Sequence, residues 1–172
     1  MTEYQWDRFK RMKYTKANLG MVFDYWTKPG LIVKWFLKEA YYTDINGKSR
    51  SEGEYPQKGD DYHWVWLQGI ETRGRVLDVV QDKLFEVTFG KNGETGEDVV
   101  VSVTFEHKDG ETMYFLEQKN MGGDLHSTAH YHLSCNKGWD YFMTNLKLLL
   151  AHGIDLREQD PTRAYNELAV SL

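Results

Sequence analysis

Cysteine is almost absent from this sequence, since Cys135 is the only one in 172 residues. An internal disulfide is therefore excluded, and the chain lacks the paired cysteines typical of proteins from oxidising compartments. Residues 1–13 alternate charged and aromatic side chains, without the continuous apolar stretch that a signal peptide or a membrane span requires. These absences predict a cytoplasmic protein.

An excess of positive charge is also lacking. Lys and Arg number 21 against 26 Asp and Glu, which gives a net charge of -5. The basic residues are scattered, so we expect neither nucleic acid nor a membrane surface as a partner. A Gly-rich phosphate loop is missing too, because Gly122-Gly123 is not followed by Lys-Ser or Lys-Thr. We interpret this pair as a relaxed connection that gives a mobile entrance to an internal cavity.

Aromatic residues are abundant, with 6 Trp, 11 Tyr and 8 Phe making up 15% of the chain. A chain of this length buries roughly 70% of its unfolded surface, so a hydrophobic core is available to them. Each ring buries a large rigid area when it faces inward. The composition therefore predicts a core lined largely by rings.

The first forty residues predict one strand and two short helices. Segment 4–12 places apolar residues irregularly among charges, which favours a strand at an edge or flank of a sheet. The apolar residues of segment 19–26 fall at i, i+3, i+4 and i+7, on one face of a helix. Pro29 ends that helix and suits the first turn of a second one, whose apolar residues keep helical spacing up to Phe36.

The middle of the sequence predicts an antiparallel meander. Residues 41–43 favour a strand, and the Asn46-Gly47 dipeptide after them favours a tight hairpin turn. Segments 85–89 and 99–105 have the period-two pattern of half-buried strands. Further turns are marked by residues that tolerate positive φ: Lys58-Gly59-Asp60, Lys91-Asn92-Gly93 and Asp109-Gly110.

The last part of the sequence is helical. Segment 127–152 has helical period and predicts the longest element, which Gly153 closes in the left-handed conformation. Asp160-Pro161 predicts the start of a short terminal helix.

These elements in this order predict an α+β fold. A curved antiparallel sheet of about six to seven strands wraps around the long C-terminal helix, and two short helices follow the first strand. No repeat or linker divides the chain. We expect one domain over residues 1–157 and a C-terminal tail or short helix over 158–172.

Several short segments carry a more specific signal. They are Lys28-Pro29-Gly30, Lys34-Trp35-Phe36, Gly74-Arg75-Val76-Leu77, Leu84-Phe85-Glu86-Val87-Thr88-Phe89, Gly138-Trp139 and Asn145-Leu146-Lys147. Over roughly residues 5–157, the chain resembles the activator of heat-shock protein 90 ATPase homologue family, which belongs to the START-like, SRPBCC or birch-pollen-allergen-like proteins with the helix-grip fold. The resemblance implies a hydrophobic cavity between sheet and long helix, which many relatives use for apolar or amphipathic small molecules. It implies no catalytic signature common to the family.

One departure from the family limits what the resemblance implies. The eukaryotic co-chaperones carry a separate N-terminal domain that makes much of the chaperone contact, and we expect no room for it here. Its Asn-rich, Trp-containing motif is missing, and Glu3-Tyr4-Gln5-Trp6 stands at the N-terminus instead. The family name by itself is therefore not a function.

Histidines of the long helix are the first candidates for chemistry. With Trp139 at the centre of the buried face, His132 projects within roughly 20° of it and is expected to face the sheet. There it is either a ligand-orienting or acid-base group or a satisfied core histidine. His126 and His130 have the i, i+4 spacing of two metal ligands, but His130 projects about 160° away from His132 and no acidic residue matches the pair. We expect no metal site.

Cys135 is the second candidate. It is expected on the buried face of the helix, three positions after His132, where a Cys-His nucleophile is conceivable. No motif supplies a lowered thiol pKa or an oxyanion donor, so the pattern favours an inert buried thiol. We predict no catalytic residue and no cofactor.

A row of rings is the third candidate. Tyr62, Trp64 and Trp66 alternate with other residues along one strand, and we expect them to face inward. They would form either an aromatic pocket wall or simply core filling.

The leading hypothesis is a non-enzymatic module that binds an apolar or aromatic small molecule between the long helix and the sheet. His132 and the Tyr114 hydroxyl would orient the ligand. The expected ligand-binding residues are Trp35, Phe36, Trp64, Trp66, Phe89, Phe105, Tyr114, His132, Cys135, Trp139 and Met143.

Two other functions stay open. The first is protein interaction with a chaperone or in a homodimer, anchored by exposed aromatics such as Trp6, Tyr41 and Tyr42. The second is acid-base catalysis of the polyketide cyclase-like type, which needs a carboxylate or Tyr partner for His132 in the cavity.

Overall fold

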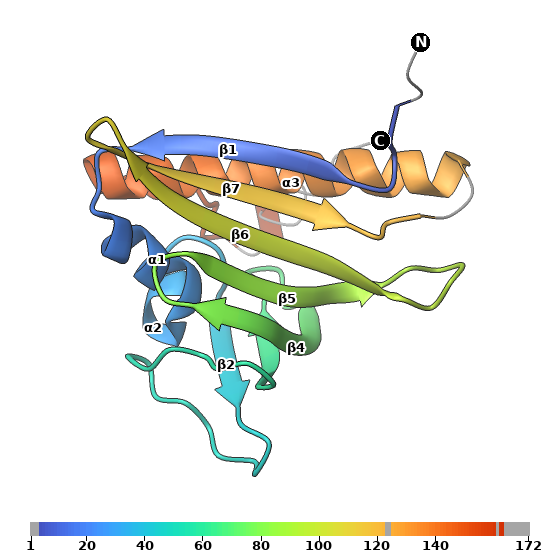
Figure 1. Ribbon diagram of the computed structural model, residues 1–172, viewed down its shortest axis with the longest axis horizontal. Coiled ribbons are helices and arrows are strands. Elements are labelled where there is room, and N and C mark those ends of the chain that lie inside the picture. Colours follow the sequence, from blue (N-terminus) through green and yellow to red (C-terminus); the bar gives the residue numbers. More distant parts are fainter. Residues whose placement is uncertain (1–3, 123–124, 161, 164–172) are drawn as a thin grey trace.

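The computed structural model describes residues 4–122, 125–160 and 162–163. Within these residues, seven strands and three helices follow one another in the predicted order (Figure 1). Their bounds are β1 Phe9–Thr15, α1 Leu19–Thr27, α2 Pro29–Ile32, β2 Glu39–Thr43, β3 Asp61–Val65, β4 Glu71–Val80, β5 Leu84–Lys91, β6 Asp98–Lys108, β7 Glu111–Lys119 and α3 Leu125–His152.

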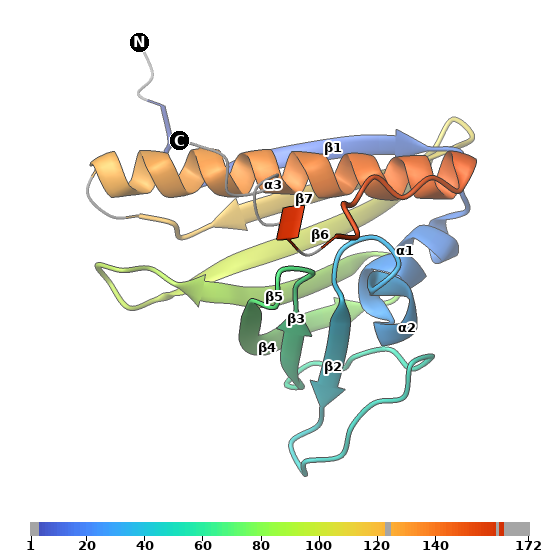
Figure 2. The same ribbon diagram turned by 180° about the vertical axis from the view of Figure 1, so that it is seen from behind.

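The strands form one antiparallel sheet in the order β1-β7-β6-β5-β4-β3-β2. The first strand lies at one edge of the sheet, as predicted, but it covers residues 9–15 rather than 4–12. It pairs with β7 from Phe9 opposite Gln118 to Thr15 opposite Thr112. The sheet curves, and the long helix α3 runs along its concave face (Figures 1 and 2). The predicted α+β helix-grip architecture is confirmed.

The turn between β6 and β7 follows directly from its sequence. Asp109 and Gly110 both have positive φ, at 53° and 77°. Two such residues in succession make the turn whose twist matches that of the flanking strands, which pins the register of this hairpin.

The Asn46-Gly47 turn forms but does not join two long strands. Gly47 has φ of 80°, and its amide donates to the carbonyl oxygen of Asp44. Beyond it, pairing is limited to a bridge between Thr43 and Ser49, and β3 starts only at residue 61. The strand that pairs with β2 along the whole length of β2 is therefore β3, after the intervening loop.

Helix α2 is shorter than predicted, since it ends at Ile32 and leaves Trp35 and Phe36 in the turn that follows. The carbonyl oxygens of Val33 and Leu37 in this turn accept hydrogen bonds from the Arg157 side chain instead of continuing a helix. A contact from the far end of the sequence therefore holds the turn in which this helix ends.

The core is built from rings, as the composition predicts. Trp35, Tyr42 and Tyr114 are completely buried, and Trp26, Tyr62 and Trp64 are nearly so. Inward-facing Val99, Val101, Val103 and Phe105 of β6 complete the sheet side of the core.

The end of α3 also agrees with the sequence. Gly153 has φ of 69°, and its amide donates to the carbonyl oxygen of Leu149, so it closes the helix in the left-handed conformation. Gly123, Pro161 and residues 164–172 lie outside the described residues, and with them the expected entrance and terminal helix. Among the described helices, none is long and apolar enough to cross a membrane.

Candidate functional site

A pocket of about 250 Å³ lies between α3 and the sheet. Its walls come from the turn after α2, the chain just beyond β3, strand β5 and one side of α3. The lining residues are Phe36, Trp66, Phe89, Tyr131, Ser134, Cys135, Gly138, Trp139 and Phe142.

Phe36 is the centre of the aromatic wall. Its ring stacks on Trp139 with centroids 5.0 Å apart and planes at 28°, and it meets Trp66 edge-on at 4.8 Å. Phe142 meets it edge-on at 4.9 Å, and Phe89 closes the far side against Trp139 at 5.5 Å. Rings at such distances and angles hold each other in fixed orientations, so the wall is preorganised.

The helix contributes one stripe of residues to the pocket. Tyr131, Cys135, Gly138 and Phe142 follow one another at intervals of four, three and four, which places them along one side of α3. Sequence reasoning centred on Trp139 missed Tyr131, Ser134, Gly138 and Phe142 as lining residues. The spacing of these residues was a signal that could have identified them. It marks a stripe beside the centre of the buried face of α3, and the pocket lies along that stripe.

Five of the eleven residues expected to bind a ligand come together around this pocket, namely Phe36, Trp66, Phe89, Cys135 and Trp139. The other six lie in the surrounding core and do not line it: Trp35, Trp64, Phe105, Tyr114, His132 and Met143.

The two groups expected to orient a ligand are engaged elsewhere. His132 is completely buried, and its ring nitrogens lie 3.0 Å from the Tyr4 hydroxyl and 3.0 Å from the carbonyl oxygen of Trp6. The Tyr114 hydroxyl donates to the carbonyl oxygen of Met143 at 2.9 Å. Both groups therefore have the geometry of satisfied core residues.

The row of rings on β3 and just beyond it divides between the two roles left open. Tyr62 and Trp64 stack on each other at 4.2 Å and fill the core, while Trp66 lines the pocket. The indole N–H of Trp66 donates to the Thr72 hydroxyl, which fixes the ring at the pocket wall.

Of the expected surface anchors, Tyr42 is a correction, because its side chain is completely buried in the core. The strand period places Tyr42 and Tyr41 on opposite faces, and Tyr41 alone is 49% exposed. Trp6 is half-buried against His132, with ring centroids 5.4 Å apart.

The polar chemistry of the helix is limited. Burial raises the pKa of the Cys135 thiol, which keeps it protonated near neutral pH. His130 is exposed, and the side chain of His126 lies outside the described part of the structure. Within that part, no group of three or more His, Cys, Asp and Glu side chains could hold a metal ion.

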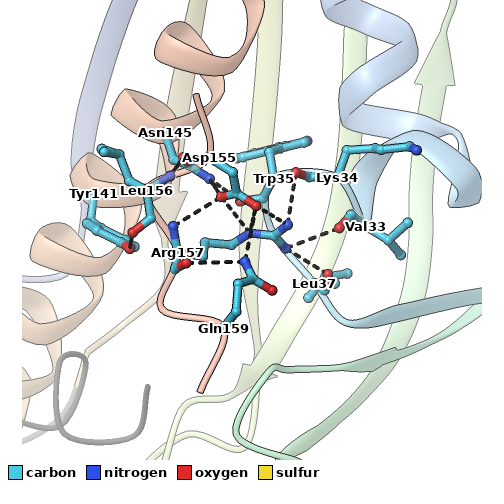
Figure 3. A network of polar contacts seen from close by, with 10 residues as sticks. All are labelled: Val33, Lys34, Trp35, Leu37, Tyr141, Asn145, Asp155, Leu156, Arg157 and Gln159. Atoms are coloured by element: carbon cyan, nitrogen blue, oxygen red, sulfur yellow. Dashed lines mark hydrogen bonds and ion pairs between the residues drawn. The ribbon is translucent and has the colours of Figure 1, made fainter. Parts of the chain in front are cut away.

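A polar cluster holds the turn that carries Phe36 (Figure 3). We call Asn145, Asp155 and Arg157 the C-terminal clasp. The guanidinium of Arg157 donates to the carbonyl oxygens of Val33 at 3.1 Å and Leu37 at 2.9 Å. It also pairs with the Asp155 carboxylate at 2.7 Å. The segment after α3 is thereby tied to the pocket wall.

Asn145 completes the clasp from inside α3. Its completely buried side-chain amide donates to the carbonyl oxygen of Trp35 at 2.8 Å and to Asp155 at 2.9 Å. Burial raises the pKa of Asp155, but the hydrogen bonds from Arg157 and Asn145 outweigh it and hold that pKa below its ordinary value. The carboxylate is therefore charged in the folded protein at neutral pH.

Comparison with known proteins connects this architecture to a family. The family model described as "Activator of Hsp90 ATPase homolog 1-like protein" matches residues 16–151. Asp155 and Arg157 of the clasp lie beyond that match. A comparison with curated proteins finds no match.

Similar solved structures include a protein of Staphylococcus saprophyticus, at 17% identity and a TM-score of 0.68, covering 87% of this chain and 96% of that one. The Aha1 dimer from Colwellia psychrerythraea is 18% identical at a TM-score of 0.65, covering 85% of this chain and 97% of that one. CalU16 from Micromonospora echinospora is 14% identical at a TM-score of 0.64, covering 94% of this chain and 81% of that one. At these identities the likeness shows the fold alone.

Proposed function

This chain belongs to the family of Activator of Hsp90 ATPase homolog 1-like proteins, and we propose that within it the chain acts as a binding module for a small apolar or aromatic molecule. The observation that carries the proposal is the ring-walled pocket between α3 and the sheet. Aromatic walls offer contact area and stacking faces to a planar ligand.

The size of the pocket limits its ligand. Pockets for drug-sized molecules span roughly 300–1,000 Å³, and this one holds about 250 Å³. A compound of one or two fused rings fits such a volume better than a long lipid.

Gly138 supports a pocket that is kept open. It lies in the interior of α3, where glycine costs about 0.5–1 kcal/mol relative to alanine. The usual structural reasons for glycine do not apply, because its φ is not positive and no described atom lies within 4 Å of a Cβ built there. The absence of a side chain at Gly138 leaves space in the pocket that this residue lines.

The test is native mass spectrometry of the protein purified from its own host, with a search for a co-purified small molecule of fixed mass. The variant Gly138→Leu puts an apolar side chain into the pocket at a position where the Cβ meets open space. Ala151→Leu is the matched control, since it adds a similar apolar side chain at an exposed position of the same helix.

We expect a bound species in the wild type and in Ala151→Leu, and its loss in Gly138→Leu. Circular dichroism verifies that both variants are folded. A ligand that survives in folded Gly138→Leu, or a wild type that is empty and binds no aromatic compound, contradicts the proposal.

A second candidate function is protein interaction, either in a homodimer or with the heat-shock chaperone for which the family is named. Strand β2 ends the sheet, and Tyr41 on it is 49% exposed, while Ile45 beyond it is 93% exposed. Exposed apolar side chains near a sheet edge are suited to a partner chain. Sedimentation analysis and a chaperone pull-down, each repeated with Ile45→Asp, test this candidate.

A further inference from the structure

One end of the pocket is polar. Tyr131 and Cys135 lie one helical turn apart on α3 and both line the pocket. Behind them, Gln118 of β7 is completely buried, and its side-chain oxygen accepts a hydrogen bond from the indole N–H of Trp139 at 2.8 Å. This bond fixes which end of the Gln118 amide carries the oxygen.

The amide nitrogen of Gln118 is consequently the end available to Tyr131 and Cys135. The Gln118 side chain lies close enough to Tyr131 and Cys135 to act on the pKa of each as a donor, although burial outweighs this effect in both. Among the described atoms, its amide nitrogen has no hydrogen-bond partner of good geometry. A buried N–H donor without a full partner costs roughly 1–3 kcal/mol. The polar end thus has hydrogen-bond donors in excess of acceptors.

The groups at this end are electrically neutral. Burial raises the pKa of Tyr131, and the contact of its hydroxyl with the neighbouring Cys135 thiol, a weak acceptor that a carbonyl oxygen can replace, raises it further. Burial likewise raises the pKa of Cys135, so the hydroxyl and the thiol both keep their protons near neutral pH. Among the described residues, no Lys, Arg or His side chain lines the pocket. A buried carboxylate would therefore meet no compensating cation, at a large cost in desolvation.

We propose that this pocket selects neutral ring compounds that carry a carbonyl oxygen, and that the Tyr131 hydroxyl donates the hydrogen bond that holds this oxygen. The inference rests on the binding function proposed above and adds the chemistry of the ligand. The rings fill the aromatic wall, the oxygen reaches the donor-rich end, and compounds of the same size that carry a carboxylate are rejected.

Three probes separate these statements. 1-Tetralone and tetralin share one two-ring skeleton with and without a carbonyl group, and 2-naphthoate is a two-ring compound with a carboxylate. Affinities are measured by titration calorimetry for the wild type and for Tyr131→Phe, which removes the hydroxyl and keeps the ring. Gly138→Leu and Ala151→Leu are titrated in parallel.

We expect 1-tetralone to bind about three- to tenfold more tightly than tetralin, as one added neutral hydrogen bond allows. The advantage should vanish in Tyr131→Phe while the affinity for tetralin stays unchanged, a result that a purely structural role of Tyr131 would not give. Naphthoate should bind at least tenfold more weakly than 1-tetralone.

The contrary outcomes are distinct. If tetralin binds as well as 1-tetralone, or Tyr131→Phe keeps the advantage, the hydrogen-bond inference is wrong although the pocket binds rings. Naphthoate binding as tightly as 1-tetralone overturns the selection for neutral ligands. If no probe binds the wild type, or all bind Gly138→Leu as well as Ala151→Leu, the proposed binding function itself fails.

Discussion

Replacing Arg157 with methionine tests whether the C-terminal clasp holds the pocket wall. The side chain of Arg157 is only 7% exposed, and it reaches three backbone carbonyls of the turn after α2 as well as Asp155. Methionine preserves much of the apolar length but removes every donor. The Asp155 carboxylate, 26% exposed, is then left without its cation.

The expected loss follows from these contacts. Removing one partner of a buried ion pair costs about 3–5 kcal/mol, and the partial exposure of Asp155 favours the lower end, about 3 kcal/mol. For a chain of this size each kcal/mol lowers the melting temperature by about 2–4 °C, so Arg157→Met should melt about 6–12 °C below the wild type. Urea unfolding gives the free energy of unfolding independently.

A matched control is present in the same segment. Arg163 is 68% exposed and pairs with Glu158 and Asp160, so Arg163→Met should cost less than about 1 kcal/mol. The Asp155→Asn and Arg157→Met pair, combined in a double-mutant cycle, should show a coupling energy of at least about 1 kcal/mol. A loss below about 1 kcal/mol for Arg157→Met, equal to that of the control, would refute the assignment of the clasp.

Four further outcomes are expected. Gly138→Ala should raise the free energy of unfolding by about 0.5–1 kcal/mol in a urea titration, because its Cβ meets open space. Gly74→Ala should lower the free energy of unfolding by about 1–3 kcal/mol, because a Cβ there would lie 2.6 Å from a ring carbon of Tyr62. Gly93→Ala is the control and should change this free energy little, because a Cβ there meets no described atom within 4 Å. The lowered pKa of Asp155 means that its stabilising effect is complete above the ordinary carboxyl pKa near 4 and is lost as the pH falls through the lower folded value. The difference in stability between wild type and Asp155→Asn should therefore shrink below about pH 4 in acid unfolding curves. Because burial raises the pKa of Cys135, iodoacetamide should alkylate it more slowly at pH 8 than it alkylates free cysteine, as followed by mass spectrometry.

Local patterns were sufficient for most of the fold. Period two along β5 and β6, helical period along α3 and the positive-φ turn residues Asp109, Gly110 and Gly153 are properties of a few neighbouring residues. Such signals can be interpreted without knowledge of distant contacts. The turn after α2 was not local in this sense, because Arg157 holds the carbonyl groups of Val33 and Leu37 from more than 100 residues away in sequence.

Only part of the candidate site could be predicted from the sequence. Sequence alone determined which rings are available and that α3 has an apolar face, because composition and periodicity are written along the chain. Whether a given ring lines the pocket or fills the core depends on what packs against it, as Trp66 and Trp64 show. His132 is satisfied by Tyr4, 128 residues away in sequence, and no spacing rule reports such a contact. Tertiary structure alone decided the pocket and the clasp. The pocket needs the sheet to close around α3, and the clasp needs the segment after α3 to meet the turn after α2.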